Sequence, residues 1–284
     1  MADQKLEAGA PPPGGNYDPY VALEFFKSTG EPVDFKEGKT IFAQSEKEIP
    51  VLRRSKMYLV LKGEVGLLAG KRVIAAVKPG EIFGELAVLS HAPRSASAVA
   101  RTPCTLIALD DRDFKAALKK KPAFALMLMG VMIRRQRDAI AQLKAGGGLG
   151  KDGEVKESVV FDHQQLAEMA DGMSSDAPVL YRAGASIVAE GQKGLRMYVV
   201  MEGRVQVSIG GRMVERLGPG GVFGESALVD GATRLANAAA ETDCELLPVT
   251  RNAFLAMVKL SPEFAEGMLT SLSERLRFLT ARLD

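Results

Sequence analysis

Glycine, glutamate and arginine occur twice in this sequence at the same spacing, and together they suit a phosphorylated ligand. Gly84 and Glu85 are followed nine residues later by Arg94, and the same three residues recur 140 positions further on. A ligand can approach the backbone of a glycine closely, because glycine has no Cβ. The guanidinium of arginine binds phosphate oxygens in a fixed geometry. A carboxylate only accepts hydrogen bonds, so a glutamate beside a phosphate is explained if it receives a sugar hydroxyl.

These residues belong to a longer repeat. Residues 57–122 and 197–262 align without a gap, and 25 of the 66 paired positions are identical. Repeats of this length indicate two duplicated domains. A glycine–glutamate–arginine spacing has no packing reason to persist in a diverged repeat. One phosphate, one arginine and one acceptor for a ribose hydroxyl describe a cyclic nucleotide.

The elements that must position these residues are short strands between glycines, flanked by helices. This pattern predicts a mainly β fold with α-helices: two tandem jelly-roll β-barrels, each with an N-terminal helix and C-terminal helices. We expect a flexible tail over 1–16, the first domain over 17–144, a glycine-rich linker over 145–157 and the second domain over 158–284. The first copy also carries six extra residues within 45–56, a basic stretch that suits either a solvated loop or a docking loop for a partner.

Both terminal helices carry apolar residues spaced alternately by three and four, which is typical of helix–helix pairing. The seam of the first runs from Leu126 to Leu143, and that of the second runs from Ala265 to Leu283. The alternative is that each helix packs only on its own barrel. Uncovered leucines are costly in water, so we predict a homodimer built on one or both helices, with intramolecular pairing as the other option.

The two copies resemble cyclic nucleotide-binding domains, the module of catabolite activator proteins, nucleotide-gated channels and kinase regulatory subunits. The resemblance rests on residues 57–65, 79–87 and 93–97, with their second set at 197–205, 219–227 and 233–237. It implies an eight-stranded jelly roll with a phosphate-binding cassette, in which Glu85 takes the ribose 2′-hydroxyl and Arg94 takes the cyclic phosphate.

The resemblance carries over to candidate ligand-binding residues in both cassettes. In the first copy they are Phe83, Gly84, Glu85, Leu86, Ala87, Arg94, Ser95 and Ala96; in the second they are Gly224, Glu225, Ser226, Ala227, Arg234, Leu235 and Ala236. The second cassette departs from the family pattern at Thr233, Leu235, Ser226 and Asn237. Leu235 has no hydroxyl where Ser95 has one, and Thr233 cannot stiffen the loop as proline does. We therefore expect the second site to bind more weakly or to prefer another nucleotide.

Composition limits the remaining chemistry. The chain has 284 residues and a net charge of +2, which argues against a wholesale electrostatic commitment to nucleic acid. No run is long and apolar enough to span a membrane, and the start lacks a signal-peptide core, so a cytoplasmic protein is expected. Two histidines and no paired cysteine spacing predict no metal site. Cys104 and Cys244, at equivalent positions, are expected to be small core residues.

The sequence thus predicts a sensor of cAMP or cGMP that is not an enzyme and that moves its C-terminal helices to control an unknown partner protein. A DNA-binding activator would need a helix-turn-helix segment beyond the second long helix, and a kinase regulatory subunit would need a basic pseudosubstrate before the first barrel; neither is seen. A scaffold or dimerisation protein with degenerate nucleotide sites is the strongest alternative, and a cyclic dinucleotide effector is a lesser one. Motifs alone do not separate cAMP from cGMP.

Overall fold

The computed structural model describes residues 17–45, 55–146, 155–162, 164–166 and 177–282. The chain divides into two compact units, residues 1–128 and 129–284, and the division falls inside one long helix. The predicted tail and most of the basic stretch 45–56 lie outside the described residues.

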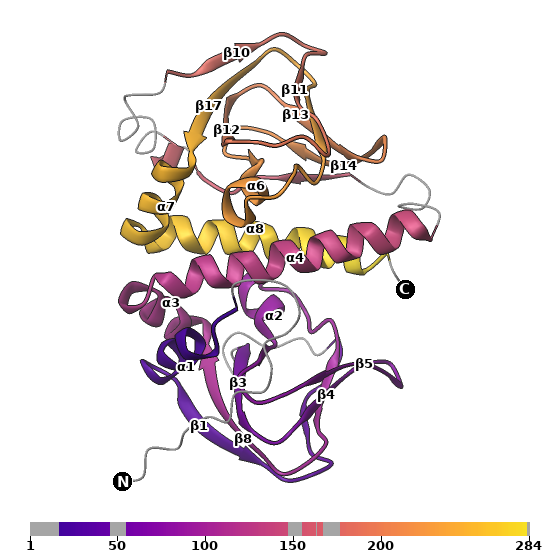
Figure 1. Cartoon of the computed structure of the whole chain (residues 1–284), viewed down its shortest axis with the longest axis vertical. Coiled ribbons are helices and arrows are strands. Elements are labelled where there is room, and N and C mark those ends of the chain that lie inside the picture. The colour runs from indigo at the N-terminus through magenta and orange to yellow at the C-terminus, as the bar shows by residue number, and fades with distance from the viewer. Residues whose placement is uncertain (1–16, 46–54, 147–154, 163, 167–176, 283–284) are drawn as a thin grey trace. The chain divides into compact units, whose positions relative to one another are not determined.

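The first unit contains a jelly roll of two four-stranded antiparallel sheets (Figure 1). One sheet has the order β1-β8-β3-β6 and the other β2-β7-β4-β5. The strands are β1 (Glu31–Phe35), β2 (Thr40–Phe42), β3 (Lys56–Lys62), β4 (Val65–Ala69), β5 (Arg72–Val77), β6 (Ile82–Phe83), β7 (Ser97–Ala100) and β8 (Cys104–Asp110). Their inward side chains form one core, in which the Tyr58 and Phe83 rings stack with centroids 5.1 Å apart. The jelly-roll prediction is confirmed.

In the described part of the first unit, three helices begin besides the cassette helix. They are α1 (Pro19–Lys27), α3 (Asp111–Lys120) and α4 (Ala123–Ala145). The side chain of Asp18 caps α1, which has proline in its first turn, as helix starts prefer. The Phe25 ring stacks on Phe124, with centroids 3.8 Å apart, and contacts Phe114 edge-on. Aromatic packing therefore joins the helices on both sides of the barrel sequence.

The second unit repeats this plan with one added strand. Its sheets have the orders β10-β17-β12-β15 and β11-β16-β13-β14-β9. The strands are β9 (Lys156–Ser158), β10 (Val179–Tyr181), β11 (Ser186–Val188), β12 (Arg196–Glu202), β13 (Val205–Ile209), β14 (Arg212–Leu217), β15 (Val222–Phe223), β16 (Asn237–Ala240) and β17 (Cys244–Thr250). β9 pairs in parallel with β14. The sequence did not predict β9, because three residues beside a glycine-rich stretch carry no strand periodicity.

Helices α7 (Arg251–Leu260) and α8 (Pro262–Thr280) follow the second barrel. The helix expected at 159–169 is wrong at its start, because residues 159–162 are not helical; residues 164–166 are helical, and the rest of that span lies outside the described residues. Within the second unit, α8 packs with the part of α4 from residue 129 onward: Ile140 and Leu143 join Leu279 in one apolar cluster. The described seam leucines of α8, from Leu269 to Leu279, are buried in the single chain. Helix pairing is thus confirmed, whereas the homodimer stays a prediction and exposed leucines no longer support it.

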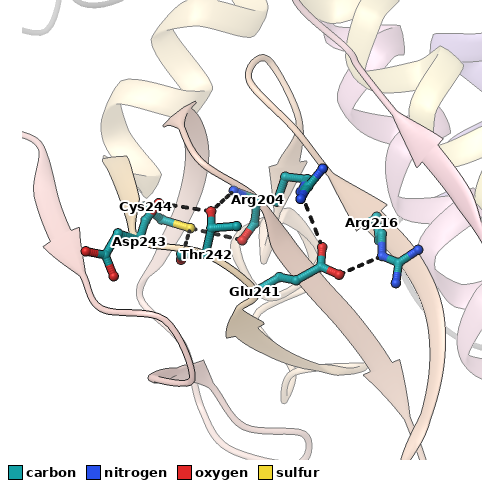
Figure 2. Close-up of polar contacts among 6 residues, drawn as sticks. All are labelled: Arg204, Arg216, Glu241, Thr242, Asp243 and Cys244. Atoms are coloured by element: carbon teal, nitrogen blue, oxygen red, sulfur yellow. Dashed lines mark hydrogen bonds and ion pairs between the residues drawn. The ribbon is translucent and has the colours of Figure 1, made fainter.

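The equivalent cysteines secure the same turn in both barrels. Figure 2 shows the second, where the Cys244 thiol donates to the Arg204 carbonyl at 3.0 Å and the Thr242 hydroxyl accepts from the Arg204 backbone N–H at 2.9 Å. Cys104 and Thr102 make the matching bonds in the first barrel. Both thiols are free and buried, which confirms their prediction as core residues.

Candidate functional site

The first cassette begins with a glycine whose backbone no other residue adopts easily. Gly84 has φ 79° and precedes the short helix α2 (Glu85–Ser90). A Cβ at Gly84 would lie 3.1 Å from both Arg94 Nη1 and the Lys56 carbonyl oxygen. Glycine is therefore required here both for its conformation and for the close approach of the arginine.

Arg94 lies beneath this turn and is 4% exposed. Its Nη1 donates to the Gly84 carbonyl at 3.0 Å, and its Cζ lies 4.1 Å from the centroid of the Phe42 ring. The backbone of Arg94 is also held, because the Ser45 N–H donates to its carbonyl. Glu85 is 3% exposed, so the structure buries an acid and a base in one loop.

The second cassette has the same backbone. Gly224 has φ 83° and precedes α6 (Glu225–Asp230). Arg234, 6% exposed, donates from Nη1 to the Gly224 carbonyl and from Nη2 to the Arg196 carbonyl, each at 2.6 Å. Burial lowers the pKa of Arg234, although Tyr198 and Glu225 partly oppose that shift. A buried cation hydrogen-bonded to neutral carbonyls is a site that an anion would stabilise.

A cavity of about 850 Å³, including its part open to solvent, lies beside the second cassette. Polar groups of the cassette line one part, and barrel and helix side chains line the rest. The cassette contributes Gly224, Glu225, Ser226, Arg234, Leu235 and Ala236, and the strands contribute Val188, Val207, Ile209 and Val214 among others.

Arg275 of α8 joins this cavity to the cassette through a buried ion pair network. Its Nε donates to Glu215 Oε2 and its Nη1 to Glu225 Oε1, both at 2.9 Å, and its Nη2 donates to the Val222 carbonyl at 2.6 Å. Burial alone would lower the pKa of Arg275, but the two carboxylates raise it above its ordinary value. The helix after the barrel is therefore tied directly to the cassette glutamate.

The second oxygen of that glutamate is the group best placed for a ligand. Glu225 is 4% exposed, and its Oε2 is buried with no hydrogen-bond partner among the described residues. A buried acceptor without a donor costs about 1–3 kcal/mol. A ligand hydroxyl in the cavity would remove that cost.

The sequence-predicted residues lie in the two cassettes, but they differ in burial and not all of them line the cavity. Six of the seven candidates in the second copy line the cavity; Ala227 is buried within α6 and is not among the lining residues. In the first copy Phe83, Ala87 and Ala96 are buried, Leu86 is half-buried and Ser95 is exposed. Asn237, one of the departures, has a structural use: its Oδ1 accepts from the Glu190 N–H, as Ser97 Oγ accepts from the Gln44 N–H.

Sequence reasoning missed Glu215, Arg275, Gln136 and Ile140, all of which line the cavity. Charged residues such as Arg275 are common on helices, so no sequence signal marks the one that turns inward. Among the described residues no group of three or more His, Cys, Asp or Glu is placed to hold a metal ion. The same described part of the chain contains no helix long and apolar enough to cross a membrane.

These features define two jelly rolls, each with a cassette that buries a glutamate and an arginine beside a glycine turn. The profile of the cyclic nucleotide-binding domain family matches residues 32–121 and 178–261, and the chain belongs to that family through both domains. The jelly roll and the cassettes are thus those that the sequence resemblance implied.

Relatives with curated names include kinase regulatory subunits, a kinase and a cyclic AMP receptor protein. The chain is 28% identical over 198 residues to a cAMP-dependent protein kinase regulatory subunit of Eremothecium gossypii, covering 69% of this chain and 38% of that protein. It is 28% identical over 223 residues to a cGMP-dependent protein kinase of Toxoplasma gondii, covering 78% of this chain and 19% of that protein. Among solved structures, the regulatory domain of Toxoplasma gondii PKA with cAMP matches at 23% identity and a TM-score of 0.30, covering 81% of this chain and 83% of that one. The chain spans less than half the length of the two curated relatives, the Eremothecium gossypii regulatory subunit and the Toxoplasma gondii kinase.

Proposed function

We propose that this chain is a non-enzymatic sensor of a cyclic mononucleotide, cAMP or cGMP, that binds ligand in both cassettes. The observation that carries the proposal is the cavity beside the second cassette. It is lined by a buried cation, Arg234, and by Glu225, whose buried Oε2 has no hydrogen-bond partner among the described residues. Arg234 would bind the cyclic phosphate, and Glu225 Oε2 would accept the ribose 2′-hydroxyl. Arg94 and Glu85 would do the same in the first cassette.

The ion pair network supports a regulatory use of binding. A ligand that binds Glu225 changes the surroundings of Arg275, which lies on α8. A ligand shifts an equilibrium between helix positions only by its difference in affinity for them, and Glu225 is where such a difference would arise. We propose that helix movement controls a partner protein, and the similarity to kinase regulatory subunits makes a kinase catalytic subunit the first candidate to test.

The proposal is tested by titrating the full chain with cAMP, cGMP and cyclic di-GMP in a calorimeter. A charge-assisted hydrogen bond contributes about 1.5–3 kcal/mol, so Arg94→Ala and Arg234→Ala should each weaken one site by about ten- to a hundredfold. Arg101→Ala, an exposed arginine of the first unit, is the matched control. Unchanged affinity in both cassette variants, with the fold intact by circular dichroism, would place the ligand elsewhere. No binding by wild-type protein would favour the scaffold alternative.

A further inference from the structure

The cavity of the second cassette has a wall that does not come from its own barrel or from α8. Gln136 and Ile140 of α4 line it. These residues belong to the second unit, although α4 itself begins at Ala123 in the first. The inference developed from this wall rests on the proposed nucleotide-binding function.

Three polar contacts hold α4 against the second cassette. Arg137 donates from Nε to Asp230 Oδ2 at 2.7 Å, from Nη2 to Asp230 Oδ1 at 3.1 Å and from Nη2 to the Thr233 carbonyl at 2.8 Å. Asp230 ends α6, and Thr233 directly precedes the phosphate-binding Arg234. The guanidinium of Arg137 therefore binds both ends of the short loop, residues 230–233, that leads from α6 to Arg234. Lys144, about two helical turns further along, adds an ion pair with Glu190.

Gln136 is placed to contact a ligand rather than to fill a core. It is 3% exposed and lines the cavity, and its one hydrogen bond among the described residues runs from Nε2 to the Leu272 carbonyl at 2.8 Å. An amide has two N–H donors and an acceptor oxygen, so one donor and the acceptor are left for the cavity. Burying an amide on an otherwise apolar seam costs stability unless those groups find partners.

The position of Gln136 within the cavity suits the base of the nucleotide. Arg234 and Glu225 take the phosphate and the ribose, so the base must extend toward the remaining walls. There Ile140, Leu279 and Phe278 offer apolar surface for the faces of a ring. A glutamine amide pairs well with the donor and acceptor on the edge of a purine.

We propose that α4 is part of the second nucleotide site and that Gln136 hydrogen-bonds the purine base there, as a specificity-determining residue. The Arg137 fork positions the helix for that contact. Because α4 runs from the first unit into the second, a nucleotide in the second site restrains a helix that both units share.

The test isolates the second site with Arg94→Ala and titrates that protein with cAMP and with cGMP. Adding Gln136→Leu should weaken the better-bound nucleotide by about five- to a hundredfold, as expected for the loss of one or two ligand hydrogen bonds. Gln142→Leu is the matched control, because Gln142 is exposed on the same helix. Arg137→Lys, which keeps the charge and loses the fork, should weaken binding in the same direction.

Hydrogen exchange on the Arg94→Ala protein gives a second measurement that does not depend on how Gln136→Leu folds. Ligand should slow exchange at the backbone amides of residues 132–143. Gln136→Leu affinities within twofold of the Gln142→Leu values, or no slowing in α4, would overturn the inference while leaving the nucleotide site in place. If the Arg94→Ala protein binds neither nucleotide, while wild type binds one, then the second site fails and the role of Gln136 fails with it.

Discussion

Replacing Arg275 with methionine is expected to destabilise the second unit strongly. The guanidinium makes three hydrogen bonds and stands between two carboxylates whose side chains are 10% and 5% exposed, those of Glu215 and Glu225. Methionine fills a similar volume but leaves both carboxylates buried without the arginine that pairs with them. Removing one partner of a buried ion pair costs about 3–5 kcal/mol, and we expect Arg275→Met to fall in that range at neutral pH.

Arg277→Met supplies a matched control two residues further along the same helix. Burial lowers the pKa of Arg277, and its Nη1 is buried with no hydrogen-bond partner among the described residues. Removing a cation that is poorly compensated should change stability by less than about 1 kcal/mol. The double variant Arg275→Met/Glu215→Gln should recover part of the loss, because it removes one of the two stranded charges.

Native-state hydrogen exchange suits this measurement because it resolves the two units. The opening free energy of amides in β12 and β17 should fall in Arg275→Met, and that of β3 and β8 in the first unit serves as the internal reference. Equal, small losses in Arg275→Met and Arg277→Met would show that the network contributes little, and the argument from buried charge would be wrong.

Two further perturbations test single contacts. Burial alone would raise the pKa of Glu190, but hydrogen bonds from Lys144 and the Gly210 N–H hold it below its ordinary value. The contribution of ionised Glu190 to folding stability is therefore present at neutral pH and is lost as pH falls through that lowered pKa. Glu190→Gln should lower the melting temperature by about 1–3 °C at pH 7 and by nothing near pH 2, and a difference that grows on acidification would contradict this sign. Gly84→Ala and Gly38→Ala both place a side chain at positive φ, which should cost about 1–2 kcal/mol of stability. Only Gly84→Ala should also weaken nucleotide binding in the first site, because only there would the added Cβ contact an arginine.

The elements that the sequence predicted best are those whose signal is local. Short apolar runs between turn glycines predicted the short strands of a barrel, and the three–four spacing predicted the long helices α4 and α8. The glycine before each cassette helix was recognisable because positive φ leaves few other choices. β9 was missed because its strand conformation depends on pairing with β14 and not on its own residues.

The sequence predicted only those residues of the site that lie close together along the chain, because only these give a local signal. Gly224, Glu225 and Arg234 lie within eleven consecutive residues, so their spacing survives as a motif. Glu215 precedes them on another strand, whereas Arg275 and Gln136 come from two helices separated by the whole barrel. Only the fold brings these three residues to the cavity. A single sequence does not show which distant residues lie close together in space.

The two barrels are therefore more different than their cassettes suggest. At the repeat offset of 140, Glu215 corresponds to Ala75, so the first copy has no carboxylate on that strand to share an arginine with its cassette glutamate. The strand carrying Ala75, β5, leaves Val73 and Ile74 about half exposed, whereas β14 is paired with β9 and buries Glu215. The expectation of a weaker second site compared cassette residues alone. Helix and strand residues outside the cassette also line the second cavity, so a comparison of cassette residues alone does not rank the two affinities.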